Sequence, residues 1–487
     1  MSNRGNLLSN LFWKFAERIS AQIVTLLVSI ILARLLEPEH YGIISIVMIF
    51  ISIANVFVSD SFGNSLIQKK NADALDFSSV LWFNIGISIC LYLILFFLAP
   101  IISKFYGDGY ELITPVLRIL GIRLIISAIN SVQQAYISRK MMFKKFFLAT
   151  MLGTVASAFV GIIMAYMDYG VWALVAQYLT NTIIDTIVLQ ITLKKKPLFK
   201  ISFSRLKGLI AFGSKILMTG LLMSGYEQIR AIIIGKMYSS ADLAYYDRGK
   251  QFPSVITTNI NSSIGAVLFP QMSKNQDKKE RIKEITRQAI KFSSYVMCPL
   301  MIGLAAVADN LVSVVLTDKW LPCVPLMQLM CIYFMFMPLH TANMQAIKAV
   351  GRSDITLNVE IIKKTIELVV LVLVMRISIT AIVVGMVLCS ILFIFINSYP
   401  NKKLINYTYR EQFKDMMPAL IMAFAMGIGV CLLGKINIYN KVVLLGLQIV
   451  AGMFIYVTLS HVSNNSEYKY LSSLVITNVK MRLTRLD

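Results

Sequence analysis

Residues 78–102 read SSVLWFNIGISICLYLILFFLAPII, an uncharged and largely apolar run of 25 residues. A helix needs about 20 such residues to cross the hydrocarbon core of a membrane. Runs of this kind recur along the 487-residue chain, in which 57% of the residues are hydrophobic and only 15% are charged. Because the runs are continuously apolar and do not alternate with polar residues, they disfavour a β-barrel. The sequence therefore predicts an all-α integral membrane protein.

The apolar runs, bounded by glycine, proline and charged residues, predict about fourteen transmembrane helices. We expect these helices near residues 11–33, 43–66, 78–102, 113–136, 147–167, 171–193, 209–234, 253–272, 288–316, 323–347, 354–376, 378–398, 415–434 and 440–460. The runs at 253–272 and 354–376 are the least hydrophobic, so a count of twelve or thirteen is the alternative.

Positively charged residues gather in alternate connections between these runs. Residues 139–145 and 274–283 hold two such groups, whereas the intervening connections are short and nearly neutral. Since short cytoplasmic loops collect Lys and Arg, both termini are predicted to be cytoplasmic. This pattern accounts for most of the formal charge of +22. The basic residues are not interleaved with stacking aromatic residues, so nucleic acid is not an expected partner.

The longest basic connection follows the sixth run and predicts a division into two lobes. A weak internal repeat, which places residues 31–36 on residues 233–238, favours lobes related by an axis along the membrane normal. Chance similarity between apolar segments is the alternative. We expect an N-lobe at 1–193, a cytoplasmic basic linker at 194–208, a C-lobe at 209–398, two additional helices within 399–460, and a cytoplasmic C-terminal tail at 461–487.

Signatures of enzymes and metal sites are missing from the sequence. It has no glycine-rich phosphate-binding loop, no His-Glu-x-x-His motif and no nucleophile elbow. No connection is long enough to fold into a catalytic domain. The six cysteines and three histidines are scattered without ligand spacing, so no metal site is expected. These observations favour a transporter over an enzyme.

Ionisable residues inside the expected spans are the candidate functional residues, because each costs roughly 2.5–3.5 kcal/mol at lipid depth unless it faces water or a partner. They include Glu17, Arg18, Asp60, Arg118, Arg123, Asp185, Glu227, Arg230, Glu360, Lys363, Lys364 and Glu367. One interpretation is internal salt bridges, such as Glu227–Arg230 or Glu360–Lys364. The other is a water-filled cavity between the lobes with a cationic bias. Arg118 and Arg123 favour the cavity, because neither has an acidic residue within a helical turn of its own span.

Several stretches carry a resemblance to a known family. Residues 30–44 read IILARLLEPEHYGII, and further pieces lie at 62–70, 243–253, 267–273, 318–322 and 349–354. In their order and spacing, the chain resembles the Wzx-type flippases of lipid-linked oligosaccharides, which are polysaccharide exporters of the MOP (MATE-like) superfamily. The resemblance implies two six-helix lobes facing each other in a V, with two more helices at the C-terminus.

The resemblance also implies a function. Such proteins move undecaprenyl-diphosphate-linked sugar repeat units across the bacterial inner membrane by alternating access, for O-antigen, capsule or exopolysaccharide biosynthesis. The expected partners are this polyprenyl-diphosphate-linked glycan, membrane lipids, a polysaccharide polymerase and glycosyltransferases. No cofactor is expected, and coupling to a proton or sodium gradient is a hypothesis. The alternatives are a cation-coupled multidrug exporter of the same superfamily and a membrane-embedded polysaccharide polymerase or ligase.

Roles for individual residues follow as hypotheses from this activity and from the charges in the spans. Arginine grips phosphate through two parallel hydrogen bonds, and a partly desolvated carboxylate near a cation can exchange an ion. The expected substrate-binding residues are Arg18, Arg118, Arg123, Arg230, Lys363 and Lys364. The expected ion-coupling or gating residues are Glu17, Asp60, Glu227, Glu360 and Glu367.

Overall fold

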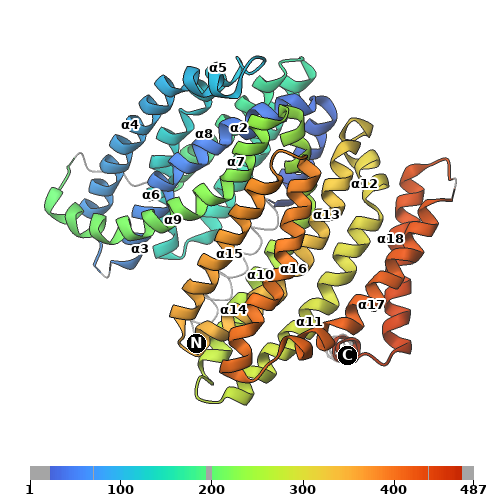
Figure 1. The fold of residues 1–487 in the computed structure, drawn as a ribbon. Coiled ribbons are helices and arrows are strands. Elements are labelled where there is room, and N and C mark those ends of the chain that lie inside the picture. Colours follow the sequence, from blue (N-terminus) through green and yellow to red (C-terminus); the bar gives the residue numbers. More distant parts are fainter. Residues whose placement is uncertain (1–21, 70, 194–199, 437, 474–487) are drawn as a thin grey trace, which may run out of the picture. The chain divides into compact units, whose positions relative to one another are not determined.

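The computed structural model describes residues 22–69, 71–193, 200–436 and 438–473, and within these ranges every regular element is a helix (Figure 1). This confirms the predicted all-α class. Glu17 and Arg18 lie outside the described residues, and so does the side chain of Asp60.

Ten helices in the described ranges are long and apolar enough to cross a membrane, which makes the chain a multi-pass membrane protein. They are Pro38–Val58, Ala74–Tyr106, Ile113–Lys140, Phe143–Tyr166, Val171–Leu193, Lys279–Ala306, Asp318–Ala349, Ile379–Ile405, Tyr409–Gly434 and Lys441–Val462.

The expected count of fourteen is not confirmed. Of the four remaining segments, 209–234 lies in helix α9, 253–272 in α10 and 354–376 in α15. The last two are the segments that the sequence ranks as least hydrophobic. The described part of the first run forms the shorter helix Gln22–Leu35.

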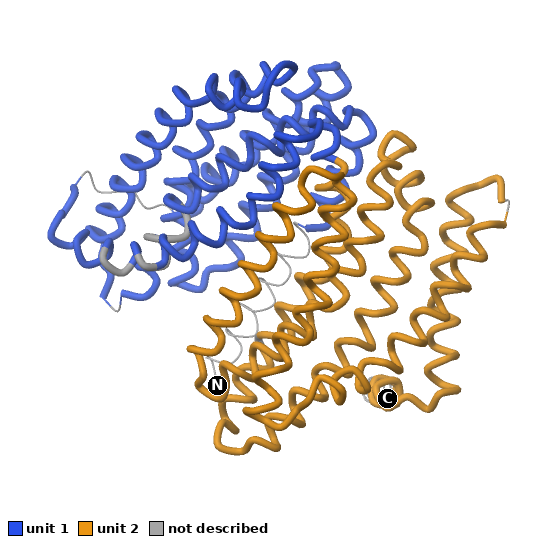
Figure 2. The backbone as a smooth tube through the Cα atoms, in the orientation of Figure 1, with its two compact units in different colours: residues 1–244 blue, residues 245–487 orange. Residues whose placement is uncertain are grey.

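The helices group into two compact units, residues 1–244 and residues 245–487, each with its own packing (Figure 2). Unit 1 contains the helix Gln22–Leu35, α2 (Pro38–Asn55), the π-helix η1 (Val56–Asp60), α3 (Ser61–Gln68), α4 (Ala74–Tyr106), α5 (Ile113–Leu120), α6 (Arg123–Lys140), α7 (Phe143–Tyr166), α8 (Val171–Leu193), α9 (Phe203–Met237) and the start of α10 (Ser240–Ser273).

Unit 2 begins inside α10. It continues with α11 (Lys279–Ala306), α12 (Ala308–Val315), the 3₁₀-helix η2 (Asp318–Cys323), α13 (Val324–Met335), α14 (Met337–Ala349), α15 (Ser353–Val374), α16 (Ile379–Ile405), α17 (Tyr409–Gly434) and α18 (Lys441–Val462). Helix α9, which the sequence assigns to the second lobe, is therefore grouped with unit 1 by its packing. The lobe boundaries drawn from the sequence stay a prediction.

Small residues let α7 and α8 lie against each other. Ala149, Gly153, Ser157, Gly161 and Ala165 recur at every fourth position of α7, and all five are buried. A Cβ at Gly153 would lie 3.1 Å from the carbonyl oxygen of Asn181, and one at Gly161 would lie 3.0 Å from Cβ of Gln177. Such close approach is typical of helix pairs in membranes. It fixes the face of α8 that carries Asn181 and Asp185.

A π-helical turn lies between helices α2 and α3 of unit 1. Helices α2 and α3 are joined through η1, where the regular hydrogen-bond ladder is interrupted. The fully buried Asn84 of α4 donates from Nδ2 to the carbonyl oxygen of Val58, at 3.2 Å, and lies 3.4 Å from Oγ of Ser131. One side chain therefore connects the π-turn to both α4 and α6.

An ion-pair cluster connects the start of α4 to the start of α9. Asp73 caps α4 in a capping box with Asp76, and Arg205 donates to Oδ2 of Asp73 at 2.5 Å. Lys69 lies 2.7 Å from Oδ1 of Asp76. The hydrogen bond from Arg205 lowers the pKa of Asp73 from its ordinary 3.8 to about 2.

Unit 2 is held by buried polar contacts. Asp415 of α17, whose side chain is 3% exposed, accepts from Nε and Nη2 of Arg287 at 2.7 and 2.9 Å, and from the hydroxyl of Tyr407 at 2.9 Å. Asn343 of α14 donates to Oε1 of Gln412 at 2.8 Å. These contacts attach α17 to α11 and to α14.

We predict that Gly42→Ala destabilises unit 1. A Cβ at Gly42 would lie 1.9 Å from the carbonyl oxygen of Ser240, so α2 and the start of α10 would have to separate. Overpacking of this kind typically costs about 1–3 kcal/mol. The thermal unfolding midpoint in detergent should fall. Gly86→Ala in α4 is the matched control, because nothing lies within 4 Å of its Cβ position. Equal midpoints for the two variants would contradict the prediction.

The Asp73–Arg205 pair predicts a pH dependence. Since the pKa of Asp73 is lower in the folded state, the contribution is complete above about pH 3.8 and is lost as the pH falls through about 2. Asp73→Asn keeps a good helix cap but removes the charge. The wild type should have the higher unfolding midpoint at pH 6, and this difference should shrink below about pH 4. Asp108→Asn, in an exposed loop, serves as the control. A difference that is constant with pH would count against the ion pair.

Candidate functional site

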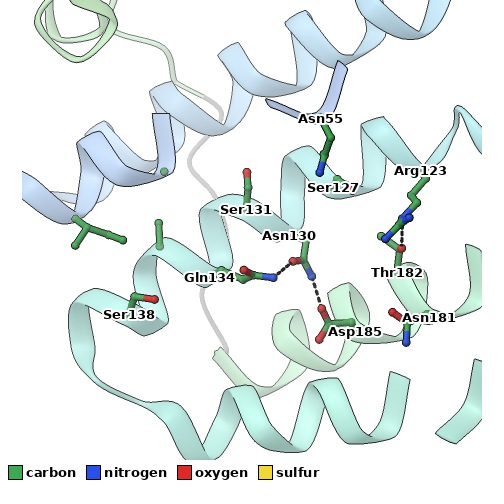
Figure 3. A pocket seen from close by; sticks show the side chains of 13 residues that line it. Asn55, Arg123, Ser127, Asn130, Ser131, Gln134, Ser138, Asn181, Thr182 and Asp185 are labelled. Atoms are coloured by element: carbon green, nitrogen blue, oxygen red, sulfur yellow. Dashed lines mark hydrogen bonds between the residues drawn. The ribbon is translucent and has the colours of Figure 1, made fainter. Parts of the chain in front are cut away.

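Unit 1 contains a polar cavity of about 510 Å³ between helices of the same bundle (Figure 3). It is lined by Asn55, Gly63, Ile67, Arg123, Ser127, Asn130, Ser131, Gln134, Ala135, Ser138, Asn181, Thr182 and Asp185, from α2, α3, α6 and α8. Ten of these thirteen side chains can hydrogen-bond, although the helices that carry them are apolar enough to span a membrane.

Helix α6 supplies one wall through a polar stripe. Ser127, Asn130, Ser131, Gln134 and Ser138 are spaced three or four residues apart, so they share one face of the helix. Helix α8 supplies the opposing wall with residues 181, 182 and 185. Asn181 also contacts α7, because its Nδ2 lies 3.5 Å from Oγ of Ser157.

Arg123 occupies one end of the cavity. It is the first residue of α6, directly after a break at residues 121–122 where the backbone bonds run from i to i+3. Its Nε donates to Oγ1 of Thr182 at 2.9 Å, and its guanidinium lies 5.5 Å from the ring centroid of Tyr178. No carboxylate among the described residues lies within ion-pair distance of it. Within the part of the chain that the structure describes, the guanidinium therefore contacts only neutral groups and keeps donors for an anion.

Asp185 and two amides form the other part of the lining. Oδ2 of Asp185 accepts from Nδ2 of Asn130 at 2.9 Å, and Nδ2 of Asn130 also reaches Oγ1 of Thr186 at 3.1 Å. Gln134 donates to Oδ1 of Asn130 at 2.5 Å (Figure 3). Oδ1 of Asp185 is buried and has no hydrogen-bond partner among the described residues. The amide chain thus holds the carboxylate with one acceptor oxygen unused.

The structure places the predicted site residues Arg118, Glu227 and Arg230 outside the lining of this cavity. Nε of Arg118 donates to the carbonyl oxygen of Phe96 at 3.2 Å, and its guanidinium lies 4.3 Å from the Phe96 ring centroid. Arg230 lies 5.7 Å from the ring centroid of Tyr226, and Glu227 is exposed. Their assigned roles, and the expected cavity between lobes, stay predictions.

On α15 the charged residues pair at a spacing of three. Lys363 lies 2.6 Å from Oε1 of Glu360, and Lys364 lies 3.4 Å from Oε2 of Glu367. The hypothesis of a Glu360–Lys364 salt bridge instead joined these charges at a spacing of four. Lys363 also lies 5.8 Å from the ring centroid of Phe393. The four residues are thus involved in ion pairs within the helix, and their roles in binding or coupling stay predictions.

Charged residues alone do not identify most of the cavity lining. Asn130, Gln134, Asn181 and Thr182 are uncharged, and Asp185 was counted among the charges of the spans without a role. The sequence does contain a pattern that predicts a polar helix face: polar residues recur at three- and four-residue spacing through 127–138. Which helix faces this stripe depends on tertiary packing.

Comparison with known proteins places the chain in a family. Residues 31–325 match the family model described as "Polysaccharide biosynthesis protein". The chain belongs to this family. TuaB of Bacillus subtilis, a teichuronic acid biosynthesis protein, is 26% identical over 304 residues, which are 62% of each chain.

Two further relatives are the lipopolysaccharide biosynthesis protein WzxC of Escherichia coli and the succinoglycan biosynthesis transport protein ExoT of Rhizobium meliloti. WzxC is 19% identical over 439 residues, 88% of this chain and 89% of its own. ExoT is 22% identical over 302 residues, which are 62% of this chain and 61% of ExoT. The match thus spans less than two thirds of TuaB and ExoT. The resemblance to Wzx-type proteins is confirmed.

Solved structures share the fold. The lipid II flippase MurJ, in an inward closed conformation, superposes with a TM-score of 0.73 at 13% identity, covering 92% of this chain and 98% of its own. An inward-facing MATE multidrug resistance transporter of the MOP superfamily gives a TM-score of 0.60 at 14% identity, covering 79% and 95%. The predicted MATE-like fold class is therefore confirmed.

We predict that the cavity of unit 1 is hydrated. In a variant whose native cysteines are replaced by alanine, Ser127→Cys on the cavity wall should react with a charged thiol reagent at least about tenfold faster than Ser157→Cys, because a thiol ionises only where water reaches it. Ser157 is the matched control, since it lies 2% exposed between α7 and α8. Labelling followed by mass spectrometry gives both rates. Equal rates would contradict a hydrated cavity.

Proposed function

We propose that this protein is a flippase for polyprenyl-diphosphate-linked oligosaccharides in the bacterial cytoplasmic membrane, serving surface polysaccharide biosynthesis. Its family and the names of its relatives support this: teichuronic acid and lipopolysaccharide biosynthesis for two, and succinoglycan transport for the third. The MATE transporter contributes a shared fold alone, so it gives no support to drug export.

The observation that carries the proposal is an arginine, Arg123, that lines a polar cavity inside apolar helices and whose partners among the described residues are all neutral. A diphosphate with an attached glycan cannot enter hydrocarbon, whereas its polyprenyl tail need not leave it. Arg123 offers a planar fork of donors that matches phosphate oxygens. The hydroxyl and amide side chains beside it replace water around the polar headgroup.

Transport by this protein requires that the headgroup site open to one leaflet at a time. Alternating access satisfies this requirement, and no covalent bond is made or broken. The candidates for coupling to a proton or sodium gradient, or for gating, remain Glu17, Asp60, Glu227, Glu360 and Glu367. With both termini in the cytoplasm, the protein would receive its substrate from glycosyltransferases on that side and deliver it to a polymerase on the other.

The test of this function is complementation in the host from which the gene has been deleted. The deletion strain should accumulate lipid-linked repeat units in the cytoplasmic leaflet and lose surface polysaccharide. Arg123→Ala should restore about tenfold less polysaccharide than wild type at equal membrane abundance, because a charge-assisted phosphate contact is lost. Arg123→Lys should lie between the two, since it keeps the charge without the fork.

Arg118→Ala provides the comparison on the same span. Arg118→Ala should lose less surface polysaccharide than Arg123→Ala, because Arg118 does not line the cavity and already donates to the Phe96 carbonyl. Equal losses in the two alanine variants would contradict the specific assignment to Arg123. Accumulation of repeat units in the outer leaflet of the deletion strain would exclude the flippase function and indicate failed polymerisation.

A further inference from the structure

We propose that the part of the cavity formed by Asp185, Asn130 and Gln134 is a saccharide subsite, which binds hydroxyl groups of the glycan while Arg123 binds the diphosphate. This inference rests on the proposed function and assigns a chemical class of ligand to residues that carry no role so far.

The hydrogen-bonding inventory of the subsite suits a hydroxyl group, which donates and accepts at once. Oδ1 of Asp185 is a buried acceptor without a partner among the described residues. Gln134 uses one amide proton on Asn130 and retains its second amide proton and its carbonyl oxygen. An incoming hydroxyl donates to the carboxylate and accepts from the amide. Neutral, hydroxyl-rich sugars present pairs of such groups.

Asn130 acts here as a positioning residue. Both protons of its Nδ2 are used, on Asp185 and on Thr186, and its Oδ1 accepts from Gln134. It therefore has little capacity left for a ligand, but it fixes the distance between the carboxylate and the Gln134 amide. This rigidity favours one arrangement of sugar hydroxyls over others, since little needs to be ordered upon binding.

Charge separates this subsite from the phosphate end. The carboxylate of Asp185 repels a diphosphate, whereas the guanidinium of Arg123 attracts it. Arg123 and Asn130 are seven residues apart on α6, which is about 10 Å along the helix axis. A diphosphate at Arg123 would thus place its first sugars along the stripe toward Gln134. Arg123 is bonded to Thr182 and Asp185 to Asn130, so each charge has a neutral partner and the two do not form an ion pair with each other.

The experiment compares two lipids on the protein in nanodiscs. One is the lipid-linked repeat unit extracted from the host membrane, and the other is undecaprenyl diphosphate without sugar. Titration followed by native mass spectrometry gives both dissociation constants. We expect the wild type to bind the glycan-bearing lipid at least about tenfold more tightly, because a site built for hydroxyls discriminates against their absence.

The variants Asp185→Asn and Gln134→Leu should each remove most of this preference, while binding of bare undecaprenyl diphosphate stays within about twofold of wild type. Gln133→Leu is the matched control on the same helix, because Gln133 pairs with Gln190 outside the cavity, and it should keep the preference. Arg123→Ala should weaken the binding of both lipids by the same factor. Unfolding midpoints show which variants are folded, and if Asp185→Asn is not, Gln134→Leu decides.

The outcomes separate the subsite from the function. If the wild type binds both lipids equally, the subsite is rejected and the flippase function stands. If it binds neither lipid, the proposed function itself fails. If Asp185→Asn weakens both lipids equally, and this effect changes with sodium concentration or pH, then Asp185 binds a cation and the saccharide subsite is refuted.

Discussion

Every polar group at lipid depth must find a partner within the chain or face water, and the structure of unit 1 depends on this constraint. An amide or a carboxylate in hydrocarbon is costly, so its presence in an apolar helix requires a compensating environment. In unit 1 that environment is a shared cavity. Small residues of α7 pack closely against residues 177, 181 and 185 of α8, and polar side chains of α8 and α6 line the cavity together. The cavity is thus a consequence of helix packing.

Unit 2 meets the same constraint by pairing its polar groups with one another. His340 is bonded at both ring nitrogens, with Asn397 donating to Nδ1 at 3.0 Å and Nε2 lying 3.3 Å from Oγ of Ser390. Asp415 is surrounded by donors from two other segments. Bonded groups of this kind fix helices against each other, although Oδ1 of Asn397 has no hydrogen-bond partner among the described residues. Asp185 differs in that its unused acceptor oxygen belongs to a side chain that lines a cavity, which is why we place ligand binding in unit 1.

Much of the fold can be predicted from the sequence, because each transmembrane helix corresponds to one continuous apolar run. All ten helices that meet the length and composition of a membrane span fall on predicted runs. The site was only partly accessible. Arg118 and Arg123 look alike in the sequence, but five residues turn a helix by about 140°, and the structure sends one to a carbonyl oxygen and the other into a cavity. The amides of α6 carry no charge, so their importance emerges only once α8 is seen to face them.

The neutral partners that Arg123 has among the described residues bear on the proposed transport. An arginine in a buried ion pair would leave an unpaired carboxylate behind when it gripped a phosphate, at a cost of about 3–5 kcal/mol, whereas a hydroxyl that loses the arginine leaves no uncompensated charge. Thr182 therefore orients the guanidinium at 2.9 Å without holding it strongly. Because the Thr182 hydroxyl also donates to the Tyr178 carbonyl, it stays in place when the arginine leaves it. A transporter must release its substrate as readily as it binds it, and a weakly held arginine can exchange between phosphate and hydroxyl at low cost. A locked ion pair at this position would stabilise the bundle more and transport less.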